Sequence, residues 1–133
     1  QLAWLEADLK RTPRERPIGV MTHIPILSIA GMVWAKPQPD KTQQVSGSLM
    51  HVDGAKIREL FAAHGRVRLA LSGHLHLVDR CEFEGVTYLC NGAVSGGWWK
   101  GRHRDCNPGY ALIDLYDDGS VERHYVEYGW RES

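Results

Sequence analysis

The chain has 133 residues, and its 16 Lys and Arg balance 16 Asp and Glu, so its formal net charge is zero. This length suits one domain, and 43% hydrophobic with 24% charged residues excludes a disordered, collagen-like or coiled-coil chain. A neutral chain lacks the positive field that binds nucleic acid polymers or membrane surfaces, so we expect neither partner. The apolar run from Ile24 to Val33 falls short of the roughly 18 residues that a membrane span needs.

The first residue and the cysteines say little about the compartment. Gln1 is not an initiator Met and no leader-like segment follows it, so we expect the natural N-terminus to precede these residues. The three cysteines, Cys81, Cys90 and Cys106, are odd in number and lack CxxC spacing, which argues against a disulfide scaffold or a zinc knuckle. We expect the three cysteines to pack in or near a core. The compartment stays open, and the protein is either cytoplasmic or exported.

Helical and strand patterns alternate at the start of the chain. Three leucines at helical spacing predict a helix over residues 1–11, which ends before Pro13. A mostly apolar run over residues 16–23 predicts a buried strand. Residues 26–50 show no sustained period, and we expect them to form a long loop that is functional or mobile.

A second helix and a second strand follow. Asp53 suits the N-cap of a helix over residues 54–63, and His64-Gly65 suits its C-terminal stop. Residues 67–72 have the pattern of a buried strand. The order of strand, helix and strand predicts a parallel crossover.

From residue 78 the hydrophobic period becomes two, which predicts antiparallel hairpins. The expected strands cover residues 78–83, 86–90, 110–116 and 121–128. If Glu84-Gly85 forms a tight turn, Cys81 faces Tyr88 across the first hairpin and Cys90 faces Asp79. The fold class expected is therefore α/β, with a mixed sheet, helices outside it and an antiparallel C-terminal part.

Three histidines follow the two strands predicted to be parallel. His23 ends the first, and His74 and His76 follow the second in what we expect to be extended chain, where a period of two puts both imidazoles on one face. Because the carboxyl ends of parallel strands open onto the same edge of a sheet, the three imidazoles are expected to converge. Neutral imidazoles that converge in this way suit a metal ion.

Several segments resemble the calcineurin-like metallophosphoesterase superfamily. They are QLAWL at residues 1–5, VMTHIP at 20–25 and LSGHLH at 71–76. NGAVSGGWW at residues 91–99 is similar to a loop of one bacterial branch of these enzymes. The resemblance implies a partial metallophosphoesterase-type α/β sandwich, in which residues 1–133 are the C-terminal half of the domain.

The resemblance also implies a chemistry. Enzymes of this superfamily bind two divalent metal ions, Mn, Fe or Zn, which polarise the phosphoryl oxygens of a phosphomonoester or phosphodiester and generate a bridging hydroxide that attacks phosphorus. By resemblance, His23 and His74 would bind one metal and His76 the other. The family's Asp-x-His, bridging Asp and Asn-His motifs have no match upstream of His23. The expected partner is therefore the N-terminal half of the same polypeptide, without which the chain should be inactive.

Carboxylates within the chain are poor substitutes for those motifs. Two dications held close together need anionic ligands, which three imidazoles do not provide. Asp40, Asp53 and Asp79 are available, but Asp53 is better explained as a helix cap and Asp79 as a hairpin residue.

Four further residues are weaker candidates for contact with the substrate, namely His51, Asn91, Trp98 and Trp99. The two tryptophans precede a basic cluster of Lys100, Arg102 and Arg104. This segment either binds a phosphorylated or cyclic nucleotide by stacking and charge, or is a solvated loop whose tryptophans pack against the sheet. His64, His103 and His124 are assigned no function.

Two other functions stay open. The first is a noncatalytic module that binds one metal or forms a homodimer through its unpaired sheet. The second is a mononuclear zinc hydrolase, in which His23, His74 and His76 bind one ion together.

Overall fold

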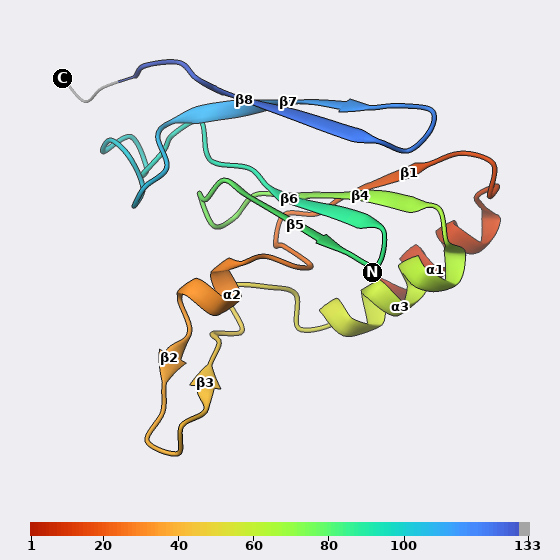
Figure 1. Ribbon diagram of the computed structural model, residues 1–133, viewed down its shortest axis with the longest axis horizontal. Helices are drawn as coiled ribbons and strands as arrows, with labels where there is room; N and C mark the ends of the chain where they lie inside the picture. The colour runs from red at the N-terminus through yellow and green to blue at the C-terminus, as the bar shows by residue number, and fades with distance from the viewer. Residues whose placement is uncertain (131–133) are drawn as a thin grey trace.

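A four-stranded mixed sheet forms the centre of the fold. Its strands lie side by side in the order β1 (Ile18–Met21), β4 (Val67–Ser72), β6 (Val86–Cys90) and β5 (Asp79–Phe83). The first three are parallel, and β5 is antiparallel to β6. The computed structural model describes residues 1–130 (Figure 1). The mixed sheet confirms the expected α/β class.

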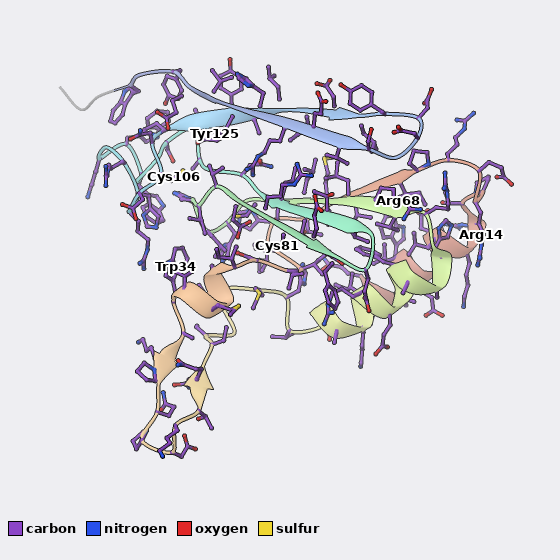
Figure 2. All side chains as sticks on the ribbon, in the orientation of Figure 1. Arg14, Trp34, Arg68, Cys81, Cys106 and Tyr125 are labelled. Atoms are coloured by element: carbon purple, nitrogen blue, oxygen red, sulfur yellow. The ribbon has the colours of Figure 1, made fainter. Side chains whose placement is uncertain are left out.

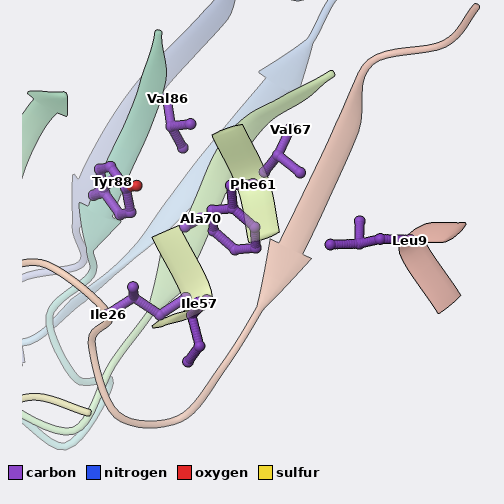
Figure 3. Packing of buried hydrophobic residues seen from close by; sticks show 8 residues of the cluster. All are labelled: Leu9, Ile26, Ile57, Phe61, Val67, Ala70, Val86 and Tyr88. Atoms are coloured by element: carbon purple, nitrogen blue, oxygen red, sulfur yellow. The ribbon is translucent and has the colours of Figure 1, made fainter. Parts of the chain in front are cut away.

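Helices α1 (Leu2–Arg11) and α3 (Gly54–His64) cover one face of this sheet (Figure 1). Their apolar stripes meet the sheet in one buried cluster (Figure 3), which comprises Leu9, Ile26, Ile57, Phe61, Val67, Ala70, Val86 and Tyr88. Burial of each large apolar side chain contributes roughly 1.5–3 kcal/mol. Gly65 ends α3 at φ 76°, as its position after His64 predicts.

The parallel crossover is also confirmed, since β1 pairs with β4 in the register Val20 to Ala70. The first strand is shorter than the expected range of residues 16–23. Pro17 has no N–H to donate, and after Met21 the Thr22 hydroxyl donates to the Ile24 carbonyl oxygen at 2.7 Å, which turns the chain out of the sheet.

The hairpin of β5 and β6 has the expected register. Cys81 pairs with Tyr88, and Asp79 pairs with Cys90. Glu84 at φ 52° and Gly85 at φ 73° form the two-residue turn, and positive values at both central positions are the mark of a type I′ turn.

A second hairpin, β7 (Gly109–Leu115) with β8 (Val121–Glu127), forms a sheet of its own. It lies over the face of the central sheet opposite to the helices (Figure 1). Arg123 Nη1 donates to the carbonyl oxygen of Asp79 at 2.6 Å and so ties β8 to the start of β5. At one end of the hairpin Tyr125 lies beside Cys106 (Figure 2), with 3.9 Å between its hydroxyl and the thiol sulfur.

The segment over residues 26–50 is more ordered than its sequence predicts. It contains α2 (Ala30–Val33) and a hairpin of β2 (Lys36–Pro37) and β3 (Gln43–Gln44), which projects from the sheet (Figure 1). Both strands of this hairpin are exposed throughout, so no hydrophobic period marks them. Within the part of the chain that the structure describes, no helix has the length and apolar character needed to cross a membrane.

Candidate metal centre

His23 and His74 meet at the carboxyl edge of the central sheet. His23 follows β1 and His74 follows β4, and 3.3 Å separates His23 Nε2 from His74 Nδ1. The two rings meet edge to face, with centroids 5.0 Å apart. Between the two loops the Gly73 N–H donates to the His23 carbonyl oxygen at 3.1 Å. The parallel pairing of β1 and β4 therefore brings these two imidazoles together, as expected.

The tautomer of His74 follows from its second contact. His74 Nε2 lies 2.8 Å from the Ser48 carbonyl oxygen, which can only accept a hydrogen bond. The proton is therefore on Nε2, and the Nδ1 lone pair faces His23. Two nitrogens that bind one tetrahedral zinc ion at about 2.0–2.1 Å lie roughly 3.3 Å apart. A shared cation and a hydrogen bond from His23 both suit the observed separation.

His76 has different neighbours. Its Nδ1 lies 2.5 Å from the Gly96 carbonyl oxygen, so that Nδ1 carries the proton and Nε2 has the lone pair. Trp98 stacks on the ring at 4.4 Å between centroids, and His103 contacts both rings. Across residues 1–130 no three His, Cys, Asp or Glu side chains are grouped so that they could hold one metal ion. The structure thus joins His23 to His74 and leaves His76 apart from them.

The backbone explains this separation. The expectation of extended chain through residues 74–76 is wrong, because β4 ends at Ser72 and both His74 (φ 66°) and His76 (φ 52°) are left-handed. Leu75 between them is buried against Ala30 and Cys90. Positive φ is uncommon outside glycine, and such residues often cluster at functional sites.

Asp79 is more than a hairpin residue. Its buried carboxylate accepts hydrogen bonds from Ser28 Oγ at 2.6 Å, the Ile29 N–H at 3.0 Å and the Cys90 N–H at 3.2 Å. These bonds join the loop after His23 to the end of β6, and they occupy both carboxylate oxygens.

The other two carboxylates considered as ligands lie elsewhere. Asp53 occupies the N-cap position of α3, but the expected capping bond from its side chain is absent from the structure described. Its φ of −90° and ψ of 10° differ from the extended conformation in which a capping side chain reaches back to the helix. Asp40 lies in the turn between β2 and β3, where hydrogen bonds from Thr42 lower the pKa of its carboxyl.

His51 lines a cavity of about 610 Å³ between α1, β1 and the start of α3. Asp53 also lines this cavity, and its remaining wall is mostly apolar, including Trp4, Leu5, Val20 and Ile57. His51 and His23 both line this cavity, which suits the expected contact of His51 with a substrate.

Asn91 follows β6 on the same edge of the sheet. Its N–H donates to the Ser72 carbonyl oxygen at 2.8 Å. Its side-chain Oδ1 is buried and accepts no hydrogen bond from any residue in the described range. Buried side-chain amides in purely structural positions usually have a hydrogen-bond partner for each polar atom, so this acceptor without a donor suits a functional position.

The basic segment after the tryptophans has partners of its own. Arg102 Nη2 bonds to Asp105 at 3.0 Å, and the Arg104 guanidinium lies 4.1 Å from the centroid of the Trp34 ring. Trp98 and Trp99 are 63% and 54% exposed, so the alternative in which both pack against the sheet is wrong. Trp99 meets Trp130, at 5.6 Å between centroids.

All three cysteines are free thiols, as their number and spacing predict. Burial, together with the nearby charge of Asp79, raises the pKa of Cys90 to about 11. Cys90 Sγ donates to the Gly73 carbonyl oxygen at 3.1 Å, directly before His74. It is a structural thiol rather than a nucleophile.

Sequence reasoning missed His103 and Gly96. Burial, followed by the charges of His76 and Arg104, lowers the pKa of His103. No periodic signal marks either residue, because both lie in an irregular loop whose shape depends on contacts with distant parts of the chain.

No family model matches the chain, and no curated protein matches it. Among solved structures, a single mutant of Vps29 from Entamoeba histolytica aligns with a TM-score of 0.32 and 24% identity, over 54% of this chain and 47% of that one. A double mutant of the same protein gives a TM-score of 0.30 and 25% identity over the same shares. The chain spans about half the length of these structures, and at these scores the likeness establishes neither a family nor an activity.

Proposed function

We propose that the chain is the C-terminal half of a binuclear metal-dependent phosphoesterase that hydrolyses phosphomonoesters or phosphodiesters. One observation carries the proposal: His23 Nε2 and His74 Nδ1 lie 3.3 Å apart at the edge of a parallel sheet, and Ser48 orients His74. The ends of parallel strands are where such sheets gather their ligands. When bound, the metals would polarise the phosphoryl oxygens of the substrate.

The donor set fits the two metal ions of such an enzyme only in part. His23 and His74 would hold one ion, and His76 would offer Nε2 to the other. His74 and His76 each donate their second ring N–H to a backbone carbonyl, which is the usual support of a histidine ligand. No carboxylate accompanies them in the described residues. The anionic ligands would come from the N-terminal half.

The open edge of β1 supports this partner. The N–H groups of Ile18 and Thr22 donate to the carbonyl oxygens of Arg66, directly before β4, and of Leu71, within β4. Along a parallel strand alternate residues bond to opposite sides, so Gly19 and Met21 direct their backbone groups away from β4. The N-terminal half would pair its own strand with this edge.

The same edge favours a second candidate, a noncatalytic module that binds metal and dimerises through β1. A mononuclear three-histidine zinc site is not formed within residues 1–130, because His76 lies apart from the pair.

Calorimetric titration of the purified chain with Zn²⁺ and Mn²⁺ tests the metal site. His23→Ala and His74→Ala should each weaken binding by at least about tenfold, since each removes one of two ligands. His124→Ala is the matched control, because His124 lies exposed on β8. Equal affinity in all four proteins would show that the histidine pair binds no metal.

Hydrolysis of bis-p-nitrophenyl phosphate with Mn²⁺ tests the need for a second half. The chain by itself should give no turnover, and a polypeptide extended at its N-terminus should give turnover that His74→Ala abolishes. Turnover by the chain alone, lost in His74→Ala, would mean that these residues build a complete site.

A further inference from the structure

The loop over residues 92–106 closes around His76. Its Gly96 carbonyl accepts the His76 Nδ1 proton at 2.5 Å. Gly96 has φ +53°, and a Cβ at this position would lie 2.7 Å from Pro108 Cγ. Gly97 donates its N–H to the Gly101 carbonyl oxygen at 2.8 Å and closes the turn. The Gly96 carbonyl is therefore held where only glycine fits.

Trp98 supplies the second contact. Its ring lies 4.4 Å from the His76 ring between centroids, with 31° between the planes. His103 packs edge-on against both, at 5.6 Å from His76 and 5.3 Å from Trp98. One hydrogen bond at Nδ1 fixes a point but lets the imidazole pivot about the bond. A ring packed against its face restrains the plane as well, and so fixes the direction of Nε2.

The neighbouring Trp99 provides a comparison for the contact between Trp98 and His76. Both indoles are more than half exposed, and both backbones have positive φ, at 57° for Trp98 and 64° for Trp99. Within residues 1–130 Trp98 contacts an imidazole, whereas Trp99 lies against Trp130. The two residues thus differ in their partner and little else.

We propose that Trp98 is a positioning residue that holds the His76 imidazole, so that Nε2 is presented to an ion at the second metal site. The part of this inference that concerns the metal rests on the proposed function, while the restraint of the ring does not. It gives Trp98 a role other than contact with the substrate.

Long-range ¹H–¹⁵N NMR of the histidine rings in the labelled chain tests the restraint directly. Wild-type His76 should be held as the Nδ1–H tautomer. Trp98→Ala should convert it to a mixture with the Nε2–H form, because the ring is then free to leave the Gly96 carbonyl. Trp98→Phe keeps an aromatic face and should retain the Nδ1–H form, as should Trp99→Ala, the matched control. An unchanged tautomer in Trp98→Ala would overturn the proposal.

Titration of the same samples with Zn²⁺ tests presentation to a metal. The Zn²⁺ concentration at the midpoint of the change in the His76 ring signals should rise about tenfold in Trp98→Ala and stay unchanged in Trp99→Ala. A tenfold loss of metal affinity is typical when a contact that supports a metal ligand is removed. An unaltered midpoint in Trp98→Ala would also overturn it. If Zn²⁺ shifts no imidazole even in the wild type, the proposed function fails, and a tautomer lost in Trp98→Ala would still establish the restraint of His76.

Discussion

A single buried carboxylate, that of Asp79, connects segments that lie far apart in the sequence. It accepts three hydrogen bonds, from Ser28, Ile29 and Cys90, and it is 7% exposed. The bonds hold the start of α2 against β5 and β6. The position of the loop after His23 therefore depends on a residue about fifty positions later.

Replacing this carboxylate should destabilise the whole chain. Asp79→Ala leaves three donors without an acceptor, and we expect a loss of about 3 kcal/mol in the free energy of unfolding. Asp114→Ala, at an exposed position of β7, is the control and should change the free energy of unfolding by less than about 0.5 kcal/mol. Urea denaturation followed by circular dichroism measures both. Equal losses in the two variants would contradict this role.

Cys90 should make stability depend on alkaline pH. Its pKa is raised from 9.0 to about 11 in the folded chain, so the unfolded thiol loses its proton first. The stabilising contribution of the protonated Cys90 thiol to the free energy of unfolding is fully present below pH 9 and is lost as pH rises toward 11. Cys90→Ser retains a donor for Gly73 but does not titrate there, so its free energy of unfolding should fall less between pH 9 and 11. Parallel curves for the two proteins in urea denaturation would contradict the assignment.

At the scale of elements, the hairpin of β5 and β6 depends on its two turn residues. Glu84 adopts φ 52°, which costs a non-glycine residue roughly 1–2 kcal/mol, and asparagine tolerates it better. Glu84→Asn should therefore stabilise the chain by about 0.5 kcal/mol. Gly85→Ala should destabilise it by at least about 1 kcal/mol.

Thermal unfolding of these variants distinguishes turn geometry from a general effect of replacing glycine. Gly47→Ala is the control, because a Cβ there meets only Val52 Cγ1, at 4.0 Å, and its φ lies outside the positive range. It should leave the melting temperature nearly unchanged. If Gly85→Ala and Gly47→Ala have the same melting temperature, the type I′ turn does not determine the stability of the hairpin.

For the whole molecule, we expect association through β1, the edge strand of the central sheet in the described residues. Exposed sheet edges pair with other chains when nothing covers them, and the Met21 side chain at the end of β1 adds an apolar group that is 81% exposed. We expect the isolated chain to self-associate as its concentration rises. Gly19→Pro removes an outward N–H while leaving the bonds between β1 and β4, so it should reduce association without loss of fold.

Sedimentation velocity across a concentration series measures this association. Val20→Pro is the matched control. Val20 lies between Ile18 and Thr22, whose N–H groups point toward β4, so its own N–H points the same way. Removing that N–H should unfold the strand rather than block its outer edge. A chain that stays monomeric at every concentration would contradict the prediction, as would equal association of wild type and Gly19→Pro.

The sequence by itself determined the elements whose pattern is local. Helical spacing of the leucines marked α1, and a period of two marked the hairpin in which Cys81 faces Tyr88. The order of strand, helix and strand was enough to predict that His23 and His74 would meet. These features follow from which residues are apolar and from the direction in which each strand runs, and both are written in short stretches of sequence.

Only the tertiary structure decided the loops. The expected period of two failed at His74 and His76 because β4 ends at Ser72 and both residues are left-handed, on either side of buried Leu75. The start of α2 is held by Asp79, and the His76 ring is held by Gly96 and Trp98. Such contacts join segments twenty to fifty residues apart and leave no period in either one. Their geometry exists only once the sheet has brought the segments together.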